Sequence, residues 1–182
     1  MTVKKIAVVG TREPTPEGAS LARKAGAEVA RRGHVLVSGG APGVDVEAML
    51  GALEAGGAVY VVLPWCIPPP EPLQRLLKES PSILVECIEA ERPRALGARN
   101  ELFRRRTIRV VDMSDAVVVA EAKTPSGGRG WGTYLAVKHA VKLGKPIYIL
   151  KPSSGDPSVR EAYRILVELG AKPIADVSSL PF

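Results

Sequence analysis

Short apolar runs rich in valine, isoleucine and alanine alternate with longer amphipathic stretches along the whole chain, and this alternation limits the fold more than any other feature. The runs have the length and β-branched composition of buried strands. Turn and capping residues separate them from the stretches between, as helices require. Strands that alternate with helices predict a parallel sheet covered on both faces. We therefore expect a single-domain α/β fold, Rossmann-like and doubly wound, with a mostly parallel sheet.

Capping residues set the limits of two expected helices. Thr15 and Asp156 each precede a proline, which is the pattern of an N-cap followed by the first helical position. Gly33 and Gly170 follow the last periodic residues of the same helices, where a helix commonly ends. The full expectation is strands at 5–9, 35–38, 58–63, 82–86, 116–121, 146–150 and 172–175, and helices at 16–32, 44–55, 73–79, 93–113, 132–143 and 157–169.

Size and apolar content predict one globular domain. The chain has 182 residues, of which 46% are hydrophobic, and this is enough to bury a core. No apolar run approaches the ~20 residues that span a bilayer, and the N-terminus leads into the first expected strand without a cleavable signal segment. We therefore expect a single domain over residues 1–182, no membrane contact and a cytoplasmic location.

The two cysteines and two histidines carry no metal-binding signature. Cys66 and Cys87 belong to no CxxC pair or Cys/His cluster, so we interpret them as buried reduced thiols. His34 and His139 are isolated in sequence, and we interpret both as structural. We expect neither a metal site nor a cofactor.

Three turns follow strands at the edge of the sheet where the carboxyl ends of parallel strands gather. They are Gly10-Thr11-Arg12, SGGAPGVD at 38–45 and SGGRGWGT at 126–133. Glycine lets a backbone approach a ligand closely, and the helix N-terminus that follows offers free N–H groups and a positive dipole end. Ligands of doubly wound folds bind at this edge, so the turns predict a phosphate site. The alternative for any one turn is a tight connection without a ligand.

The turns supply most of the candidate phosphate or nucleic-acid contacts. None is a Walker loop, and the fingerprint GxGxxG does not follow the first strand, which disfavours ATP and NAD chemistry. The candidates are Gly10, Thr11, Arg12, Ser38, Gly39, Gly40, Gly43, Asp45, Ser126, Gly127, Gly128, Arg129, Gly130, Gly132 and Thr133.

Three residues near the turns have two interpretations each. Asp45, in the first turn of a helix, either compensates the helix dipole or hydrogen bonds to its own loop or to a ligand hydroxyl. Trp131 and Trp65 either stack on a base or pack against the protein.

A basic segment at 92–109 precedes the central apolar strand. Arginine suits phosphate because its planar fork donates two parallel hydrogen bonds, and the net charge of +6 also favours an anionic partner. Arg99 and Arg106 are seven residues apart and share a helix face. The alternative is a solvated basic helix paired with glutamates such as Glu89 and Glu101. The segment holds Arg92, Arg94, Arg99, Arg104, Arg105, Arg106 and Arg109.

These features, in this order, resemble the Rossmann core of the DprA/Smf family of DNA-processing proteins, within a superfamily that includes LOG-type and molybdenum-cofactor-carrier-like proteins. The turn at 10–12 resembles the family's GSR, and 38–53 resembles its SG-A-GID…AH-GAL signature with Met49 in place of histidine. Either Arg99-Asn100 or Arg106-Thr107 resembles the RN motif. The stretches 114–122, 126–133 and 163–180 resemble the family's central strand, its SGT loop and its closing helix and strand.

The resemblance implies single-stranded DNA binding, a role in DNA processing or recombination, a recombinase partner and a homodimer. It adds Arg99, Asn100 and Arg106 to the candidate contacts. Larger members carry a helical N-terminal domain and a winged-helix-like C-terminal domain, neither of which we expect here. The core binding site is therefore the part we expect to be kept.

Two other functions are compatible with the same turns. LOG-type phosphoribohydrolases carry a motif of the form PGGxGTxxE, which ends in an acidic residue. The matching stretch here, GTYLA at 132–136, has no acid at that place to assist glycosidic cleavage. A nucleotide or small-ligand sensor would bind without chemistry. We expect a single-stranded DNA-binding protein without catalytic residues, with a nucleotide-binding protein or a LOG-like phosphoribohydrolase as the alternatives.

Overall fold

The computed structural model describes residues 2–70, 73–126 and 131–182. Its strands are β1 (Lys5–Val9), β2 (Val35–Ser38), β3 (Val59–Ile67), β4 (Ile83–Glu91), β5 (Ala116–Val119), β6 (Ile147–Leu150) and β7 (Lys172–Ile174). Its helices are α1 (Pro16–Arg31), α2 (Val44–Glu54), α3 (Leu73–Glu79), α4 (Leu96–Met113), α5 (Gly132–Lys142), α6 (Pro157–Leu169) and the 3-10 helix η1 (Val177–Ser179).

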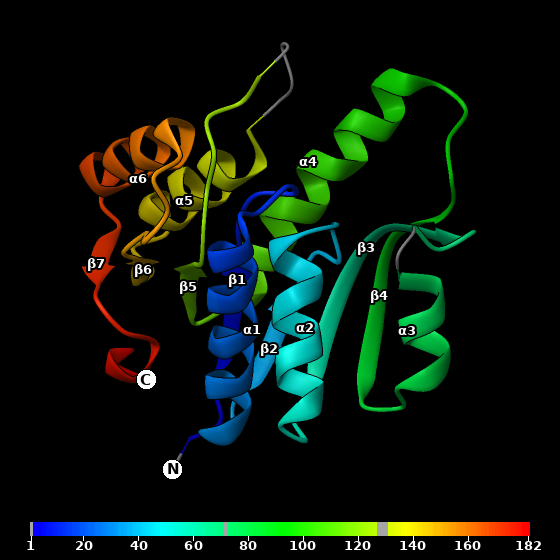
Figure 1. The fold of residues 1–182 in the computed structure, drawn as a ribbon. Helices are drawn as coiled ribbons and strands as arrows, with labels where there is room; N and C mark the ends of the chain where they lie inside the picture. Colours follow the sequence, from blue (N-terminus) through cyan, green and yellow to red (C-terminus); the bar gives the residue numbers. More distant parts are fainter. Residues whose placement is uncertain (1, 71–72, 127–130) are drawn as a thin grey trace.

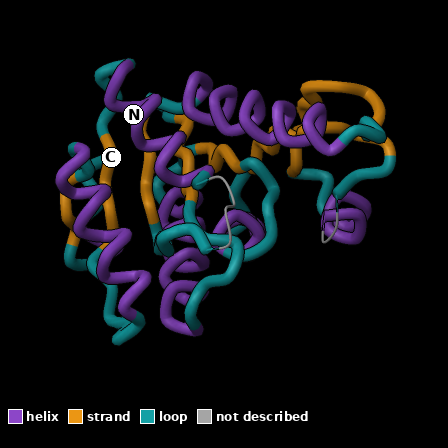
Figure 2. The backbone as a smooth tube through the Cα atoms, turned by 90° about the horizontal axis from the view of Figure 1, so that it is seen from above, coloured by secondary structure: helices purple, strands orange, loops and turns teal. Residues whose placement is uncertain are grey.

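The strands form one parallel sheet in the order β4-β3-β2-β1-β5-β6-β7 (Figure 1). On one face, α1, α2, α3 and η1 pack against strand residues such as Ile6 and Val8. On the other, α4, α5 and α6 pack against the residues between them, such as Ala7 and Val117. Figure 2 shows helices on both sides of the strands from above. The doubly wound, Rossmann-like α/β fold expected from the sequence is thus confirmed.

The helices that the structure describes are all too short or too polar to cross a membrane. Most of their limits are those expected, because local capping chemistry sets them. The Thr15 hydroxyl accepts from Gly18 N at 3.1 Å and begins α1, and the Asp156 carboxylate accepts from Ser158 N at 2.8 Å and begins α6.

Helices α1 and α2 pack through their backbones beside the central strands. A Cβ on Gly26 would lie 1.9 Å from the carbonyl oxygen of Ala48, and one on Gly51 would lie 1.9 Å from that of Arg23. The Arg23 side chain then reaches across to Glu54, with Nε 3.0 Å from a carboxylate oxygen. This close packing holds α2, which follows the second glycine-rich turn, against α1.

Strands β3 and β4 run further than expected. We expected them to end at residues 63 and 86, but each has nine residues, and β3 continues through Pro64. Strand β2 pairs with β3 only as far as Val61, so one edge of β3 is open beyond that point. Proline is tolerated on an open strand edge because no hydrogen bond needs its missing N–H.

Cys66 on β3 and Cys87 on β4 form a disulfide with a Cα–Cα distance of 5.8 Å. The expectation of two buried reduced thiols is therefore wrong, and both residues are only half-buried. Sequence spacing could not show the pairing, because it requires β3 and β4 to lie side by side in the folded sheet.

Candidate functional site

The sheet changes winding direction between β1 and β5. The chain passes from β1 to β2 on one side and from β5 to β6 on the other, so the connections diverge at the carboxyl ends of the two strands, which is where doubly wound folds bind ligands. Thr11 N donates to the carbonyl oxygen of Glu121 at 2.8 Å across this point. The turn at 10–12 and the segment after β5 therefore meet at this switch point.

The second glycine-rich turn is held from inside by Asp45, which is 7% exposed. One carboxylate oxygen of Asp45 accepts from Gly39 N and from Ala41 N, both at 3.2 Å. The Ser38 hydroxyl accepts from Gly40 N at 3.1 Å. Of the interpretations open for Asp45, the structure gives it the hydrogen bonds to its own loop.

Two glycines of this turn make room for other parts of the protein. Gly43 has a φ of +83°, and a Cβ there would lie 2.6 Å from the backbone of Arg12. A Cβ on Gly39 would lie 2.4 Å from a guanidinium nitrogen of Arg106. Val44 N donates to the Thr11 carbonyl at 3.1 Å. The first two turns and α4 are thus brought together.

Arg106 is the charged group at the centre of this arrangement, with 6% of its surface exposed. Its Nη1 donates to the Gly39 carbonyl, and its buried Nε has no partner within the described part of the chain. Burial lowers the pKa of Arg106 and raises the pKa of Asp45, while the attraction between the two charges opposes both shifts. A buried cation is therefore held beside the turn.

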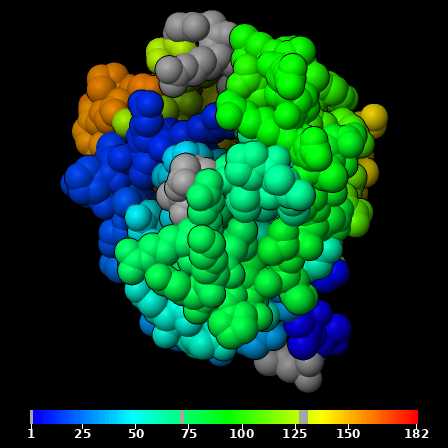
Figure 3. Space-filling view, turned by 90° about the vertical axis from the view of Figure 1, so that its right-hand side faces the viewer, coloured from blue at the N-terminus to red at the C-terminus, as the bar shows by residue number. Residues whose placement is uncertain are grey.

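An aromatic residue that we did not single out from the sequence, Phe103, lies beside Arg106 on α4. The exposed Arg12 guanidinium lies 5.1 Å from the centre of the Phe103 ring, and that of Arg106 lies 5.8 Å away. Trp65, 5% exposed, contacts the same ring with a centroid distance of 5.4 Å, so Trp65 packs against the protein. Figure 3 shows α4 in green beside the blue β1–α1 turn. In the sequence, Phe103 lies three residues before Arg106 and so on the same side of a helix, and this spacing is the signal that could have identified it.

Four other arginines of the basic segment lie on α4 and fall into two groups, whereas Arg92 and Arg94 precede the helix and are exposed. Arg104, Arg105 and Arg109 form exposed ion pairs with glutamates, such as the 2.7 Å contact of Arg109 with Glu86. The solvated-helix interpretation applies to these three. Arg99 is half-buried, and its Nε is also without a partner among the described residues. Of the two candidate pairs, Arg106-Thr107 contacts the second turn through the Arg106 guanidinium at Gly39, whereas Asn100 of the other pair is exposed.

The third glycine-rich turn is described only in part. Gly127, Gly128, Arg129 and Gly130 lie outside the described residues, whereas Ser126 and Gly132 are exposed and Thr133 is buried. The Trp131 ring stacks on Tyr134 with a centroid distance of 5.2 Å, and both pack against the core. This contact favours the packing role of Trp131.

A buried carboxylate, Glu121, joins α1 to the end of β5. It is 4% exposed, and its two oxygens accept from Thr15 N at 2.7 Å and from the Thr15 hydroxyl at 2.6 Å. A Cβ on Gly18 would collide with this carboxylate. Glu121 falls at the end of the strand expected at 116–121 and is not among the candidate contacts. An acidic residue at the end of an apolar run is the sequence signal that could have identified it.

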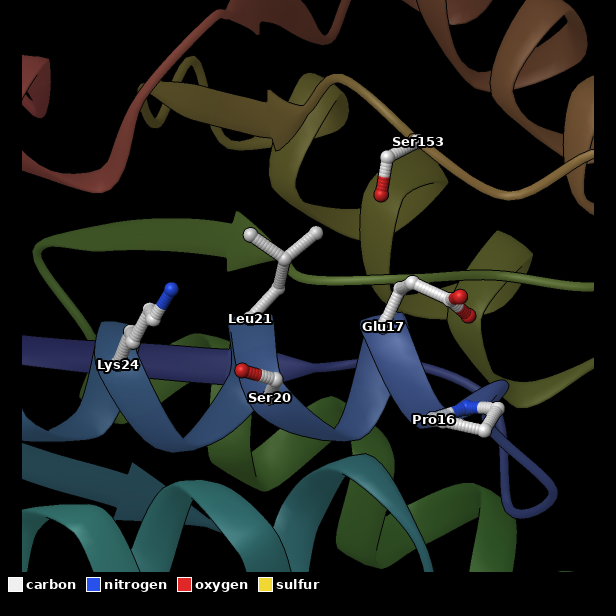
Figure 4. A pocket seen from close by; sticks show the side chains of 6 residues that line it. All are labelled: Pro16, Glu17, Ser20, Leu21, Lys24 and Ser153. Carbon is white, nitrogen blue, oxygen red and sulfur yellow. The ribbon is translucent and has the colours of Figure 1, made fainter.

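A shallow cavity of about 380 Å³ lies between α1 and the segment after β6 (Figure 4). Figure 4 shows Leu21 and Lys24 rising from α1 toward the segment that carries Ser153. None of the candidate contacts lines this cavity. In the ranges that the structure covers, no three His, Cys, Asp or Glu side chains are grouped to hold a metal ion.

The fold and this edge define a Rossmann-like α/β protein with a buried arginine and glycine-rich turns at its switch point. The family described as DNA recombination-mediator protein A matches residues 1–180, and the chain belongs to this family of DNA-processing proteins. The resemblance to DprA/Smf is thereby confirmed.

Individual relatives agree with this assignment. The DNA processing protein DprA of Bacillus subtilis (strain 168) is 26% identical over 171 residues, which are 94% of this chain and 56% of that protein. The chain thus spans about half the length of that relative. The structure of DNA processing protein A from Helicobacter pylori, described for its single-stranded DNA binding mode, has a TM-score of 0.75 and 27% identity, over 97% of this chain and 78% of that one. That of DprA from Streptococcus pneumoniae has a TM-score of 0.78 and 25% identity, over 97% and 60%.

Proposed function

We propose that this protein binds single-stranded DNA at the carboxyl edge of the sheet, with phosphates beside Arg106, Arg12 and Arg99. The observation that carries the proposal is the buried Arg106 at the second turn. A buried cation is costly unless it is paired, and Arg106 keeps an Nε–H without an acceptor among the described residues. A phosphate oxygen is a strong acceptor that would satisfy an arginine of this kind.

The residues near Arg106 favour a ligand with several phosphates in a row, such as a polynucleotide, over a ligand with one phosphate group. Arg12 is exposed in the turn after β1, and Arg99 lies about 10 Å along α4 from Arg106 at 1.5 Å per residue. The N–H groups of Gly39, Gly40 and Ala41 already have protein acceptors. Side-chain arginines, more than these backbone groups, would therefore carry the binding.

A single strand suits this edge better than a duplex. Unstacked nucleotides can bend so that the backbone follows a groove, while bases contact aromatic or arginine planes. The Helicobacter relative, whose structure is described by its single-stranded DNA binding mode, supports this choice.

The alternatives differ in what they require of the site. A LOG-like phosphoribohydrolase needs a carboxylate that is available to substrate, but Asp45 accepts from the N–H groups of its loop and Glu121 accepts from Thr15 N. This supports holding a phosphate over cleaving a glycosidic bond. A nucleotide-binding protein would use the same arginines for one phosphate group.

A competition experiment distinguishes these functions. A fluorescent oligothymidylate should bind with an affinity that falls as salt rises, with a log–log slope of about −0.7 per phosphate neutralised. Unlabelled oligonucleotide should displace it, whereas mononucleotides at the same phosphate concentration should not. Displacement by mononucleotides alone, or release of adenine from a nucleoside monophosphate, would favour an alternative.

Other expectations from the resemblance stay predictions. They are a homodimer, a recombinase partner, a role in DNA recombination, a cytoplasmic location and one domain over residues 1–182. Analytical ultracentrifugation and limited proteolysis measure the first and the last of these.

A further inference from the structure

The outer corner of the sheet is a two-stranded extension, formed by residues 62–67 of β3 and 86–91 of β4. Strand β2 pairs with β3 no further than Val61, and β4 is the outermost strand, so within the part of the chain that the structure describes these segments form strand pairs only with each other. A two-stranded ribbon has marginal stability unless something else holds it. The Cys66–Cys87 disulfide crosses this extension and joins its strands covalently.

The extension supports the candidate site through a short series of contacts. Trp65 precedes Cys66 and packs on Phe103 of α4. Arg92 N donates to the Ile67 carbonyl at 3.1 Å, and the Arg92 guanidinium lies 5.6 Å from the Trp65 ring. Phe103 in turn lies against Arg12. The disulfide is therefore two ring contacts from an arginine proposed to bind phosphate.

The location of the disulfide also suits exchange with small thiols. Cys66 and Cys87 are both half-buried on the outermost pair of strands, where they pack against the border of the core without being enclosed by it. Their Cα–Cα distance of 5.8 Å lies within the range of an ordinary disulfide. Where the surroundings are reducing, a disulfide in such a place is commonly transient or redox-sensing.

We propose that Cys66 and Cys87 form a reversible thiol–disulfide site whose oxidised state fixes the β3–β4 extension and strengthens nucleic-acid binding at the adjacent edge. The effect on binding rests on the function proposed above. The partner is a low-molecular-weight thiol or a dithiol reductant, which reaches the bond from solvent.

The exchange balances in two steps. A thiolate attacks one sulfur of the disulfide, the S–S bond breaks, and the other cysteine leaves as a thiolate that takes a proton. A second thiol then attacks the mixed disulfide and releases the first cysteine. Two electrons pass to the protein, which gains two thiols, and the reductant becomes a disulfide.

Reduction should loosen the extension and lower the fraction of molecules in which Trp65 supports Phe103. Apparent affinity falls in proportion to the binding-competent fraction, so a fall to about one fifth gives roughly fivefold weaker binding. Amide hydrogen exchange should rise more within 62–67 and 86–91 than in β1 or β5, because the extension loosens locally in addition to any loss of global stability.

The test compares full-length protein oxidised with oxidised dithiothreitol and reduced with dithiothreitol. Alkylation and mass spectrometry should count no free thiols in the first sample and two in the second. Fluorescence anisotropy with labelled oligothymidylate should give the weaker affinity after reduction. The double variant Cys66→Ser, Cys87→Ser should bind with the reduced protein's affinity under both conditions.

The outcomes separate this inference from the proposed function. Equal affinity in both redox states, or two free thiols after oxidation, would overturn the inference while leaving DNA binding intact. Absence of binding in both states would refute the proposed function and, with it, the effect on binding. Hydrogen exchange then decides whether the disulfide fixes the extension, because unchanged protection after reduction refutes that part too.

Discussion

Replacing Gly51 by alanine should destabilise the protein by separating α1 from α2. The new Cβ would lie 1.9 Å from the Arg23 carbonyl oxygen, whereas ordinary contact begins at 3.4 Å, so the helices must move apart by about 1.5 Å. Backbone atoms on both sides leave no side chain that could rotate away. Overpacking of this kind costs about 3 kcal/mol, and the better helix propensity of alanine returns about 1 kcal/mol.

The expected net loss is about 2 kcal/mol, which for a protein of this size lowers Tm by roughly 4–8 °C. Gly97→Ala is the matched control, since Gly97 lies in α4 with nothing within 4 Å of its added Cβ. That variant should be unchanged or more stable by up to about 1 kcal/mol. Urea unfolding followed by circular dichroism measures both. Equal stability of the two variants would refute the backbone contact between α1 and α2.

Three further effects on stability follow from buried or capping groups. His34 is buried, and burial with nearby Lys4 lowers its pKa; the unfolded state therefore binds a proton first, and unfolding free energy should fall as pH drops below about 6.5. The test measures the difference in unfolding free energy between wild type and His34→Phe from pH 8 to pH 5.5. A difference that does not change with pH would contradict this role of His34. Lys145 Nζ donates to three carbonyls at the end of α4, each at 2.7 Å, so Lys145→Met should cost about 1–3 kcal/mol in urea unfolding, and a neutral result would count against this cap. Reduction of the disulfide, which spans 21 residues, should cost about 3 kcal/mol, and an unchanged urea midpoint would contradict that figure.

Local chemistry made most of the fold predictable. Thr15 and Asp156 accept from backbone N–H groups of the following turn, so the residues that start α1 and α6 are decided within a few positions of sequence. The run at 116–119 is buried throughout, as an apolar strand covered on both faces must be. The ends of β3 and β4 depend instead on where β2 stops, which is a property of the assembled sheet.

The candidate site was predictable in its residue types but not in its contacts. The sequence offered Arg99 and Arg106 equally, and only the placement of α4 against the second turn brings Arg106 to Gly39. Phe103 and Glu121 were missed because their partners are distant in sequence. Phe103 contacts Arg12 and Glu121 accepts from Thr15, and neither contact can be inferred from local spacing. The cysteine pair is only 21 residues apart, and it was misjudged because the two strands that carry the cysteines come together only in the assembled sheet.

The most direct test of the central claim is the affinity for labelled oligothymidylate of three variants across a salt series. Arg106→Gln and the exposed Arg12→Gln should each bind about 10-fold or more weakly, because a charge-assisted contact is worth about 1.5–3 kcal/mol. Each should also lower the salt slope by about 0.7. Arg104→Gln, on the same helix but paired with Glu101, should bind like wild type. A wild-type affinity and slope for both Arg106→Gln and Arg12→Gln, or an equal loss in Arg104→Gln, would contradict binding at the switch point.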